Sequence, residues 1–471
     1  MRHISTRGEA PALGFADAML AGLARDGGLY VPESWPRLTG ETILGFAGKP
    51  YAEVAVEILR LFTADSIPEG DLARMAREAY GTFRHPAVAP IAQLDANTFA
   101  LELFHGPTLA FKDVAMQLLA RLMDYALAAR GDRRTIVVAT SGDTGGAAVE
   151  AFGDRNQADL IVLFPQGRIS AVQRRMMTTA NAANVHTVAI DGTFDDCQAI
   201  VKAMFNHAAF RDRVRLSGVN SINWARIVAQ AVYYFTAAVA LGAPRRKIAF
   251  TVPTGNFGDI YAGYVAARLG LPLDRLIVAT NVNDILTRTL ATGTYELRDV
   301  TPTTSPSMDI QVASNFERLL FDAYDRDGHA VRTLMNSLAQ ARRFSLSAEA
   351  LSQIRALFSA GRADEDEVAA TMRAVRRETG NFVDPHTAVG IAVAEKETRD
   401  PAVPMVVLST AHAAKFPEAV EAACGARPQL PEWLSDLNQR PERVTALPAD
   451  QSAVERFVLA SSRAAQEGAA A

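Results

Sequence analysis

Cysteine is scarce in this chain of 471 residues, which contains two, Cys197 and Cys424. This scarcity excludes a disulfide framework, and no Cys-x-x-Cys pair is present to clamp a metal. The eight histidines are scattered without the spacing of metal ligands, so we expect no metal site. Low cysteine usage fits a reducing compartment, and we therefore expect a cytoplasmic location.

A large excess of charge of one sign and long hydrophobic runs are also missing. The 48 Lys and Arg residues balance 52 Asp and Glu residues, for a net charge of −4. This balance gives no electrostatic reason to expect a nucleic-acid partner. Apolar stretches such as 227–241 contain polar breaks and fall short of the ~20 residues that span a bilayer. No apolar run follows the basic residues at the N-terminus, so we expect neither a secretory signal nor a membrane partner.

Apolar residues make up 49% of the chain, enough for a substantial core divided among about two to four folding units. From Thr98 onward, short β-branched or apolar runs alternate with amphipathic helical stretches. The runs are 135–139, 160–164, 185–190, 247–252, 276–279 and 405–408. Apolar runs of this kind between helices are typical of strands buried on both faces, as in parallel sheets. The sequence therefore predicts an α/β fold with enough strands for two sheets.

The rest of the chain departs from this alternation. Residues 1–95 are predicted to be mostly helical, and residues 331–377 to form helix after helix. The segment 301–308, rich in Pro, Ser and Thr, is interpreted as a linker. Beyond Pro428 the α/β pattern is lost, which indicates a C-terminal tail.

Four loops of unusual composition follow predicted strands, where doubly wound folds bind their ligands. The first is 104–113, in which Lys112 lies beside Phe111 at an apolar helix start. A buried ammonium tends to lose its proton or find a covalent use. The alternative is a lysine that snorkels or pairs with Asp113.

The other three loops are rich in glycine or hydroxyl groups. The segment 139–146 contains Ser141, Asp143 and Thr144, and its glycines would let backbone N–H groups bind an anion; the alternative is a plain helix cap. The segment 253–259 has two glycines around Asn256 and can surround a phosphate. The segment 409–416 brings hydroxyls, an imidazole and an ammonium to a strand end, or simply caps a helix. Together the four loops indicate a phosphate-bearing ligand beside a lysine.

The order FHGPTLAFKD, SGDTGGAA, PTGNFGD and STAHAAKF resembles the threonine synthases, a family of fold type II pyridoxal-phosphate enzymes. The segments 5–8, 25–32, 220–226 and 305–310 are similar to the family as well, so the resemblance runs from about residue 4 to residue 416. It implies two open, mainly parallel sheet domains of the tryptophan synthase β type and an added helical N-terminal segment. The implied parts are an N-terminal segment 1–95, a large cofactor domain 96–134 with 246–425, a small domain 135–245, and a tail 426–471.

The resemblance also implies the site residues. Lys112 would hold the aldehyde of pyridoxal 5'-phosphate covalently and act as the catalytic base. The other cofactor contacts implied are Gly255, Asn256, Phe257 and Gly258 at the phosphate, Thr410 at the pyridine nitrogen, and Asp143 near the cofactor's edge. The substrate contacts implied are Ser141, Thr144, Asn223, Arg226 and Lys415, with no metal.

The reaction implied is that of a carbon–oxygen lyase acting on phosphate, the last step of threonine biosynthesis. O-phospho-L-homoserine and water would become L-threonine and phosphate, in a monomer or homodimer. The alternatives are a phospho-lyase that releases phosphate without forming threonine, a serine/threonine dehydratase, and a non-catalytic cofactor-binding protein. Dehydratases usually have a shorter lysine motif, and a non-catalytic relative would be expected to have lost Lys112.

Overall fold

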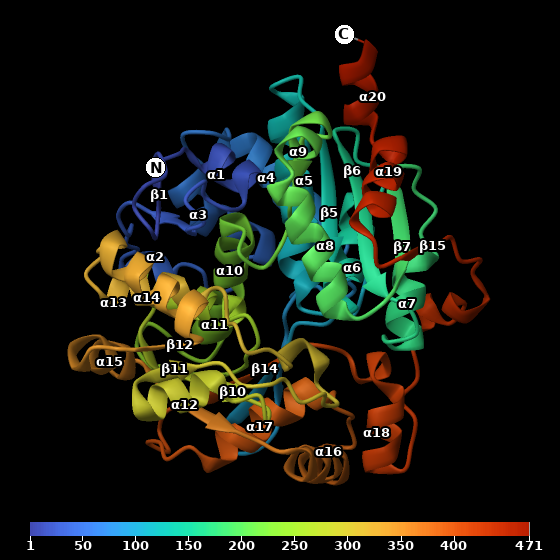
Figure 1. Cartoon of the computed structure of the whole chain (residues 1–471). Helices are drawn as coiled ribbons and strands as arrows, with labels where there is room; N and C mark the ends of the chain where they lie inside the picture. Colours follow the sequence, from blue (N-terminus) through green and yellow to red (C-terminus); the bar gives the residue numbers. More distant parts are fainter. Residues whose placement is uncertain (471) are drawn as a thin grey trace.

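Two mainly parallel sheets form the framework of the protein in a computed structural model, which describes residues 1–470 and the side chains of residues 1–467 (Figure 1). The larger sheet has the strand order β13-β10-β9-β14-β4-β3, in which β3 runs antiparallel to β4 and the other neighbours are parallel. Its strands are β3 (Ile91–Gln93), β4 (Thr98–Glu102), β9 (Ile248–Pro253), β10 (Leu273–Thr280), β13 (Phe358–Arg362) and β14 (Met405–Ser409). The predicted α/β fold with mainly parallel sheets is confirmed.

The smaller sheet is parallel throughout, with the order β15-β7-β6-β5-β8. Its strands are β5 (Arg134–Ala139), β6 (Ala158–Pro165), β7 (Val185–Asp191), β8 (Leu216–Ser217) and β15 (Thr445–Pro448). Every residue of β6 is buried, which explains why its sequence ADLIVLFP is almost continuously apolar.

Alternate residues of the central strands enter different cores, because successive side chains of a strand point to opposite faces. In β14, Val406 and Leu408 belong to a core shared with α10 (Trp224–Ala240) and α11 (Gly258–Arg268). Met405 and Val407 belong to a second core shared with α16 (Glu365–Thr379) and α17 (Pro385–Lys396). The large sheet is therefore covered on both faces.

The N-terminal segment packs beside α10 through α3 and carries a small antiparallel pair. It comprises β1 (His3–Ser5), α1 (Phe15–Ala21), β2 (Tyr30–Pro32), α2 (Gly40–Leu44), α3 (Tyr51–Thr63) and α4 (Glu69–Tyr80). The helices around the small sheet are α5 (Lys112–Ala128), α6 (Asp143–Phe152), α7 (Ala171–Thr178), α8 (Phe194–Asn206), α9 (Ala208–Arg213), α19 (Gln451–Ser461) and α20 (Arg463–Ala470). The remaining elements beside the large sheet are α12 (Ile285–Thr292), β11 (Thr294–Glu296), η1 (Pro306–Met308), α13 (Phe316–Ala323), α14 (Gly328–Ala341), β12 (Arg343–Ser345), α15 (Ala348–Arg355), η2 (Ala413–Lys415) and α18 (Pro417–Cys424).

The segment 331–377 is not helical throughout, so that prediction is wrong. Strand β12 pairs with β11, and β13 pairs in parallel with β10 at the edge of the large sheet. Strand β13 reads FSAGR, too short and too polar to indicate a strand; its pairing with β10 stabilises it there.

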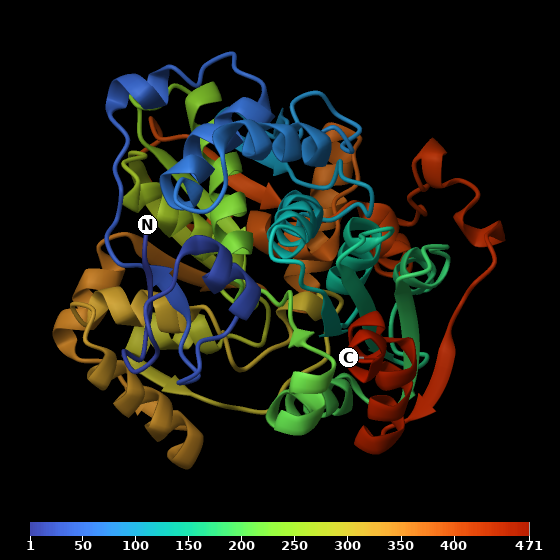
Figure 2. The ribbon, with the colours of Figure 1, turned by 90° about the horizontal axis from the view of Figure 1, so that it is seen from above.

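The C-terminal segment is not a loose tail. Strand β15 adds to the small sheet beside β7, and Val454 and Val458 of α19 are fully buried in that sheet's outer core. Seen from above, this segment follows the outer side of the small sheet, with the short turns η3 (Glu432–Leu434) and η4 (Leu437–Gln439) before it (Figure 2). The sequence TALP is too short and mixed to predict a strand. It becomes one because β7 supplies its hydrogen-bonding partner.

Candidate active site

The loop that leads to Lys112 is bonded to the segment that follows β14. The amide N–H of Phe111 donates to the carbonyl of Thr410 at 2.8 Å, and that of His412 donates to Leu109 at 3.0 Å. Strands β4 and β14 are parallel neighbours, so their carboxyl ends lie at one edge of the sheet. The first and fourth loops singled out in the sequence therefore meet, with Lys112 next to Thr410.

Lys112 is the first residue of α5 and is 9% exposed. Its Nζ lies 4.5 Å from the centroid of the Phe111 ring and 3.7 Å from a carboxylate oxygen of Asp143. Burial lowers the pKa of Lys112, the nearby charges of Lys415 and Arg226 lower it further, and Asp143 opposes the shift. The amine can therefore lose its proton more easily than an exposed lysine.

Asp113 is not the partner of Lys112. Its carboxylate accepts hydrogen bonds from the backbone N–H of Thr108 at 2.8 Å and from the Thr108 hydroxyl at 2.6 Å. Burial raises the pKa of Asp113 to about 6, although these hydrogen bonds act in the opposite direction. The alternative of a simple Lys112–Asp113 pair is therefore wrong, and Asp113 fixes the loop instead.

Asp143 begins α6 on the small-sheet side and is 4% exposed. One of its oxygens lies 2.7 Å from Nζ of Lys415 and accepts a hydrogen bond from the Gln173 amide at 2.9 Å. Burial alone would raise the pKa of Asp143, but Lys415 and Lys112 hold that pKa well below its usual value. Asp143 is therefore an anion that links loops from both sheets.

Lys415 is 1% exposed and is already engaged inside the protein. Besides Asp143, its ammonium donates to the carbonyl of Thr108 at 2.7 Å. Two of its three N–H donors are thus used, and the group acts as the counter-ion of Asp143.

Ser141 and Thr144 differ from the other residues of their loop because their side chains are half-buried and make no hydrogen bond within the described side chains. The cap of α6 comes from Thr140, whose hydroxyl accepts from the N–H groups of Gly142 and Gly145, both at 2.9 Å. A capping role for Ser141 or Asp143 is therefore not needed, and the hydroxyls of Ser141 and Thr144 remain open to a ligand.

The loop between β9 and α11 has the features of an anion site. A Cβ atom added to Gly255 would lie 2.3 Å from the carbonyl oxygen of Ser307, so no side chain fits there. Phe257 adopts the left-handed conformation, with a φ of 63°. Within residues 1–470, the backbone N–H groups from Gly255 to Ile260 make no hydrogen bond. Unpaired N–H groups at a helix N-terminus attract anions, and this donor set, which includes Asn256 and Gly258, fits a phosphate ester.

Thr410 is 5% exposed, and its hydroxyl makes no hydrogen bond to the side chains or backbone of the described chain. It is a neutral group that can donate or accept one hydrogen bond. Three groups at one edge of the sheet fit the three ends of pyridoxal phosphate. The buried Lys112 fits its aldehyde, the unpaired N–H groups of the loop 255–258 fit its phosphate, and the hydroxyl of Thr410 fits its ring nitrogen.

Arg226 and Asn223 lie at the start of α10. Arg226 is 3% exposed, donates to the carbonyl of Val219 at 3.0 Å, and has a buried Nε without a partner. Burial lowers the pKa of Arg226 to about 10. Asn223 caps α10 through Ala225 and donates to Met19 at 2.8 Å, so both ends of its amide are used inside the fold. Arg226 keeps a donor for a ligand, whereas the side-chain amide of Asn223 is engaged within the fold.

Two polar residues near the site were not predicted from the sequence. Gln173 contacts Asp143, but its only signal was the capping-box spacing from Ser170. Asp259 stands at the end of the phosphate loop, and its carboxylate accepts a hydrogen bond from the hydroxyl of Tyr233. Burial raises the pKa of Asp259 to about 7, opposed by hydrogen bonds from Tyr233 and Tyr234. No spacing in the sequence relates these partners, because helix packing brings them together.

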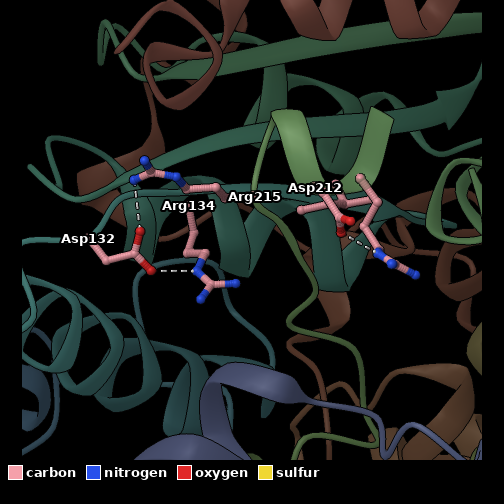
Figure 3. A pocket seen from close by; sticks show the side chains of 6 residues that line it. Asp132, Arg134, Asp212 and Arg215 are labelled. Atoms are coloured by element: carbon pink, nitrogen blue, oxygen red, sulfur yellow. Dashed lines mark hydrogen bonds and ion pairs between the residues drawn. The ribbon is translucent and has the colours of Figure 1, made fainter. Parts of the chain in front are cut away.

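A surface cavity of about 370 Å³ lies away from these residues. It is lined by Asp132, Arg134, Arg211, Asp212, Arg215 and Leu216 (Figure 3). Asp132 accepts hydrogen bonds from Arg134 at 3.0 Å and from Arg215 at 2.9 Å, so these charges are paired. Arg134 begins β5, whereas Ser141 follows its carboxyl end. The cavity therefore lies at the edge opposite the candidate site.

The described residues 1–470 contain no group of three or more His, Cys, Asp or Glu side chains that could hold a metal ion. Among their helices, none is both long and apolar enough to cross a membrane.

Models of known protein families match almost the whole chain. Residues 2–80 match the threonine synthase N terminus, residues 83–411 match the pyridoxal-phosphate dependent enzymes, and residues 387–458 match the C-terminal part of threonine synthase. The family expected from the four loops is confirmed, as are its enzyme class and its cofactor.

Individual relatives agree. The chain is 52% identical to the threonine synthase of Pseudomonas aeruginosa over 97% of this chain and 98% of that protein, and 39% identical to that of Saccharomyces cerevisiae over 92% of each. It resembles the crystal structure of a threonine synthase with bound pyridoxal phosphate from Brucella melitensis, with 62% identity, a TM-score of 0.96, and coverage of 98% and 100%. The yeast threonine synthase structure gives 36% identity, a TM-score of 0.93 and coverage of 98% of each chain. With these matches spanning both sheets and every loop of the site, the chain belongs to the threonine synthase family of pyridoxal-phosphate-dependent enzymes.

Proposed function

We propose that this enzyme converts O-phospho-L-homoserine and water to L-threonine and phosphate at the edge where Lys112, Asp143 and the loop 255–258 meet. The observation that carries this proposal is the buried Lys112, whose pKa is lowered, beside a phosphate loop with unpaired N–H groups. When bound, pyridoxal phosphate supplies the electron sink that stabilises negative charge on the substrate's carbon atoms.

Lys112 is the proposed catalytic base. The amine of Lys112 would remove the α-proton and one β-proton of the bound substrate. It would then return one proton to Cγ, where the phosphate has left, and one to Cα, while water supplies the hydroxyl at Cβ. The lowered pKa supports this role because a base must be neutral before it accepts a proton. Asp143, kept anionic by Lys415, stabilises the ammonium form of Lys112 after each transfer.

Thr410 is the proposed partner of the pyridine nitrogen. Its hydroxyl is neutral, so it cannot protonate the ring as fully as a carboxylic acid would. The phosphate of the cofactor is assigned to the N–H groups of Gly255, Asn256, Phe257 and Gly258.

The departing phosphate of the substrate is a dianion and needs donors. We assign this role to Ser141, Thr144 and Arg226, whose polar atoms are not fully used inside the protein. Lys415 keeps Asp143 anionic, and its third N–H donor is left to bind the departing phosphate. Asn223 is assigned to positioning α10 rather than to substrate.

We further propose that residues 96–134 with 246–425 and residues 135–245 behave as a large and a small domain, with the site between them. The contact between Asp143 and Lys415 joins these two parts. Cysteine usage supports a cytoplasmic enzyme, and either a monomer or a homodimer is compatible with a site built from one chain.

Product analysis tests the proposed reaction. The purified enzyme is incubated with O-phospho-L-homoserine, and phosphate, threonine and 2-oxobutyrate are measured together. Threonine and phosphate in equal amounts are expected. Phosphate with 2-oxobutyrate and no threonine would identify a phospho-lyase and overturn the proposal.

A further inference from the structure

Asp384 and His386 form a buried polar network behind the site, to which neither the motifs nor the proposed reaction assigns a role. Asp384 is fully buried at the N-terminus of α17, and His386 is 4% exposed. The Asp384 carboxylate accepts from the backbone N–H groups of His386 at 3.0 Å and of Thr387 at 3.1 Å, which cap the helix. It also contacts Nδ1 of the His386 ring at 2.7 Å and the Thr387 hydroxyl. The cap is thus complete without the His386 side chain.

The hydrogen bonds fix which nitrogen of His386 carries the proton. Because Nδ1 faces a carboxylate, it is the donor, and Nε2 is left as the acceptor. Nε2 accepts the backbone N–H of Ser307 at 3.3 Å. His386 therefore connects α17 to the turn η1, far away in the sequence.

Ser307 lies directly against the phosphate loop. Its carbonyl oxygen occupies the space that a Cβ atom on Gly255 would need, at 2.3 Å. His386 accepts the N–H of Ser307, and the carbonyl of Ser307 faces Gly255. The position of Ser307 therefore determines how closely η1 approaches the phosphate loop.

The same carboxylate also reaches the other end of the site. The hydroxyl of Thr387 lies 3.2 Å from the hydroxyl of Ser409, the residue before Thr410. Both hydroxyls are buried, with Thr387 fully enclosed and Ser409 3% exposed. Asp384 thus has one path through His386 and Ser307 to Gly255, and a second through Thr387 and Ser409 to Thr410.

We propose that Asp384 and His386 are positioning residues that set the separation between the phosphate loop and Thr410, and thereby the fit of pyridoxal phosphate. This inference rests on the proposed assignment of the phosphate to Gly255–Gly258 and of the ring nitrogen to Thr410. The cofactor is rigid, so two anchoring segments on different strands must be held at one spacing. A shared carboxylate at the start of α17 holds both, because α17 packs across β9 and β14.

Three substitutions of His386 separate this role from simple structural support. His386→Gln keeps an acceptor near the position of Nε2 for Ser307. His386→Asn keeps a donor for Asp384 near the position of Nδ1 but does not reach Ser307. His386→Phe keeps the ring without either polar contact. His186→Phe, on β7 of the small sheet, is the matched control.

Two properties of the holoenzyme are measured: the Kd for pyridoxal phosphate by titration after dialysis, and the phosphorus NMR signal of the bound cofactor phosphate. We expect about a 3- to 10-fold weaker Kd and a shifted phosphorus signal in His386→Phe and His386→Asn, the size expected for one lost hydrogen bond. His386→Gln and His186→Phe are expected to match the parent protein. If His386→Asn matches the parent while His386→Phe does not, the ring only supports Asp384 and the proposal is overturned.

Gly255→Ala distinguishes failure of this proposal from failure of the phosphate assignment. That variant is expected to weaken binding and shift the phosphorus signal, because its methyl group meets the Ser307 carbonyl. A response in Gly255→Ala with none in His386→Phe overturns the positioning role alone. No response in either variant overturns the phosphate assignment and the positioning role together.

Discussion

The ammonium of Lys415 lies 2.7 Å from the carboxylate of Asp143, whereas the ammonium of Lys112 lies 3.7 Å from it. Asp143 therefore forms its closer ion pair with Lys415, and its electrostatic attraction to the more distant Lys112 is weaker. All three groups are buried, so each charge acts strongly on the others. Burial alone would raise the pKa of Asp143, but the two lysines hold it low. Burial lowers the pKa of Lys112, and Asp143 only partly opposes that shift.

Replacing Lys415 tests this division of charge. In Lys415→Met, the loss of a nearby positive charge raises the pKa of Lys112, so its neutral form appears only at higher pH. The acidic limb of the pH–kcat profile should move to higher pH, and the free energy of unfolding should fall by about 3 kcal/mol because a buried pair is broken. Lys415→Arg, which keeps the charge, should leave the limb closer to its original position. If the acidic limb of the pH–kcat profile does not move in Lys415→Met, the charge of Lys415 does not control the pKa of Lys112.

The open hydroxyls beside Asp143 are predicted to control how the reaction divides between products. Ser141→Ala and Thr144→Val should lower threonine formation more than substrate consumption, because a misplaced water lets the unsaturated intermediate escape to 2-oxobutyrate. Loss of one positioned polar contact typically costs about 10²- to 10³-fold in rate. Phosphate release and threonine formation are assayed in parallel. A proportional fall in both, without 2-oxobutyrate, would mean that the loop serves binding alone.

His3 should make the protein less stable in acid. Burial lowers its pKa in the folded state to about 4, against 6.5 for an exposed histidine. Between these values the unfolded chain binds the extra proton, so stability falls as the pH drops from about 6.5 to about 4, by on the order of 3 kcal/mol. Urea unfolding at pH 7 and pH 4.5 should show a smaller difference in His3→Asn than in the parent. The same substitution at an exposed position, His329→Asn, serves as the control variant.

Asp259 should act in the opposite direction. Its pKa is raised from 3.8 to about 7, chiefly by burial, so the folded protein keeps a proton that the unfolded chain releases. This contribution to stability is complete below about pH 4 and is lost as the pH rises through about 7. Asp259→Asn is neutral at every pH and should flatten the decline in unfolding free energy between pH 5 and pH 8. If the slope stays the same, Asp259 is ionised in the folded state across that range.

Some parts of this structure could be read from the sequence because they are local. Lys112 with Phe111, and the glycines of 253–259, stand in short contiguous segments at strand ends, where composition alone indicates chemistry. A nearly continuous run of apolar residues, as in β6, likewise predicts a buried strand from the sequence alone.

Other parts depend on contacts between distant segments. Gln173 reaches Asp143 only because α7 packs beside α6, and His386 reaches Ser307 across 79 positions of the chain. Strands β13 and β15 are short and mixed in composition, and pairing with β10 and β7 determines that they are strands. The spacing of residues along the chain contains none of this information.

The most direct test of the account is to locate the cofactor on the chain. The holoenzyme is reduced with borohydride, which fixes pyridoxal phosphate to its lysine, then digested, and the labelled peptide is sequenced by mass spectrometry. The account predicts the label on Lys112, and predicts that Lys112→Ala folds but neither takes up the label nor forms threonine. A label on Lys415, Lys202 or Lys247, or threonine formation by Lys112→Ala, would contradict it.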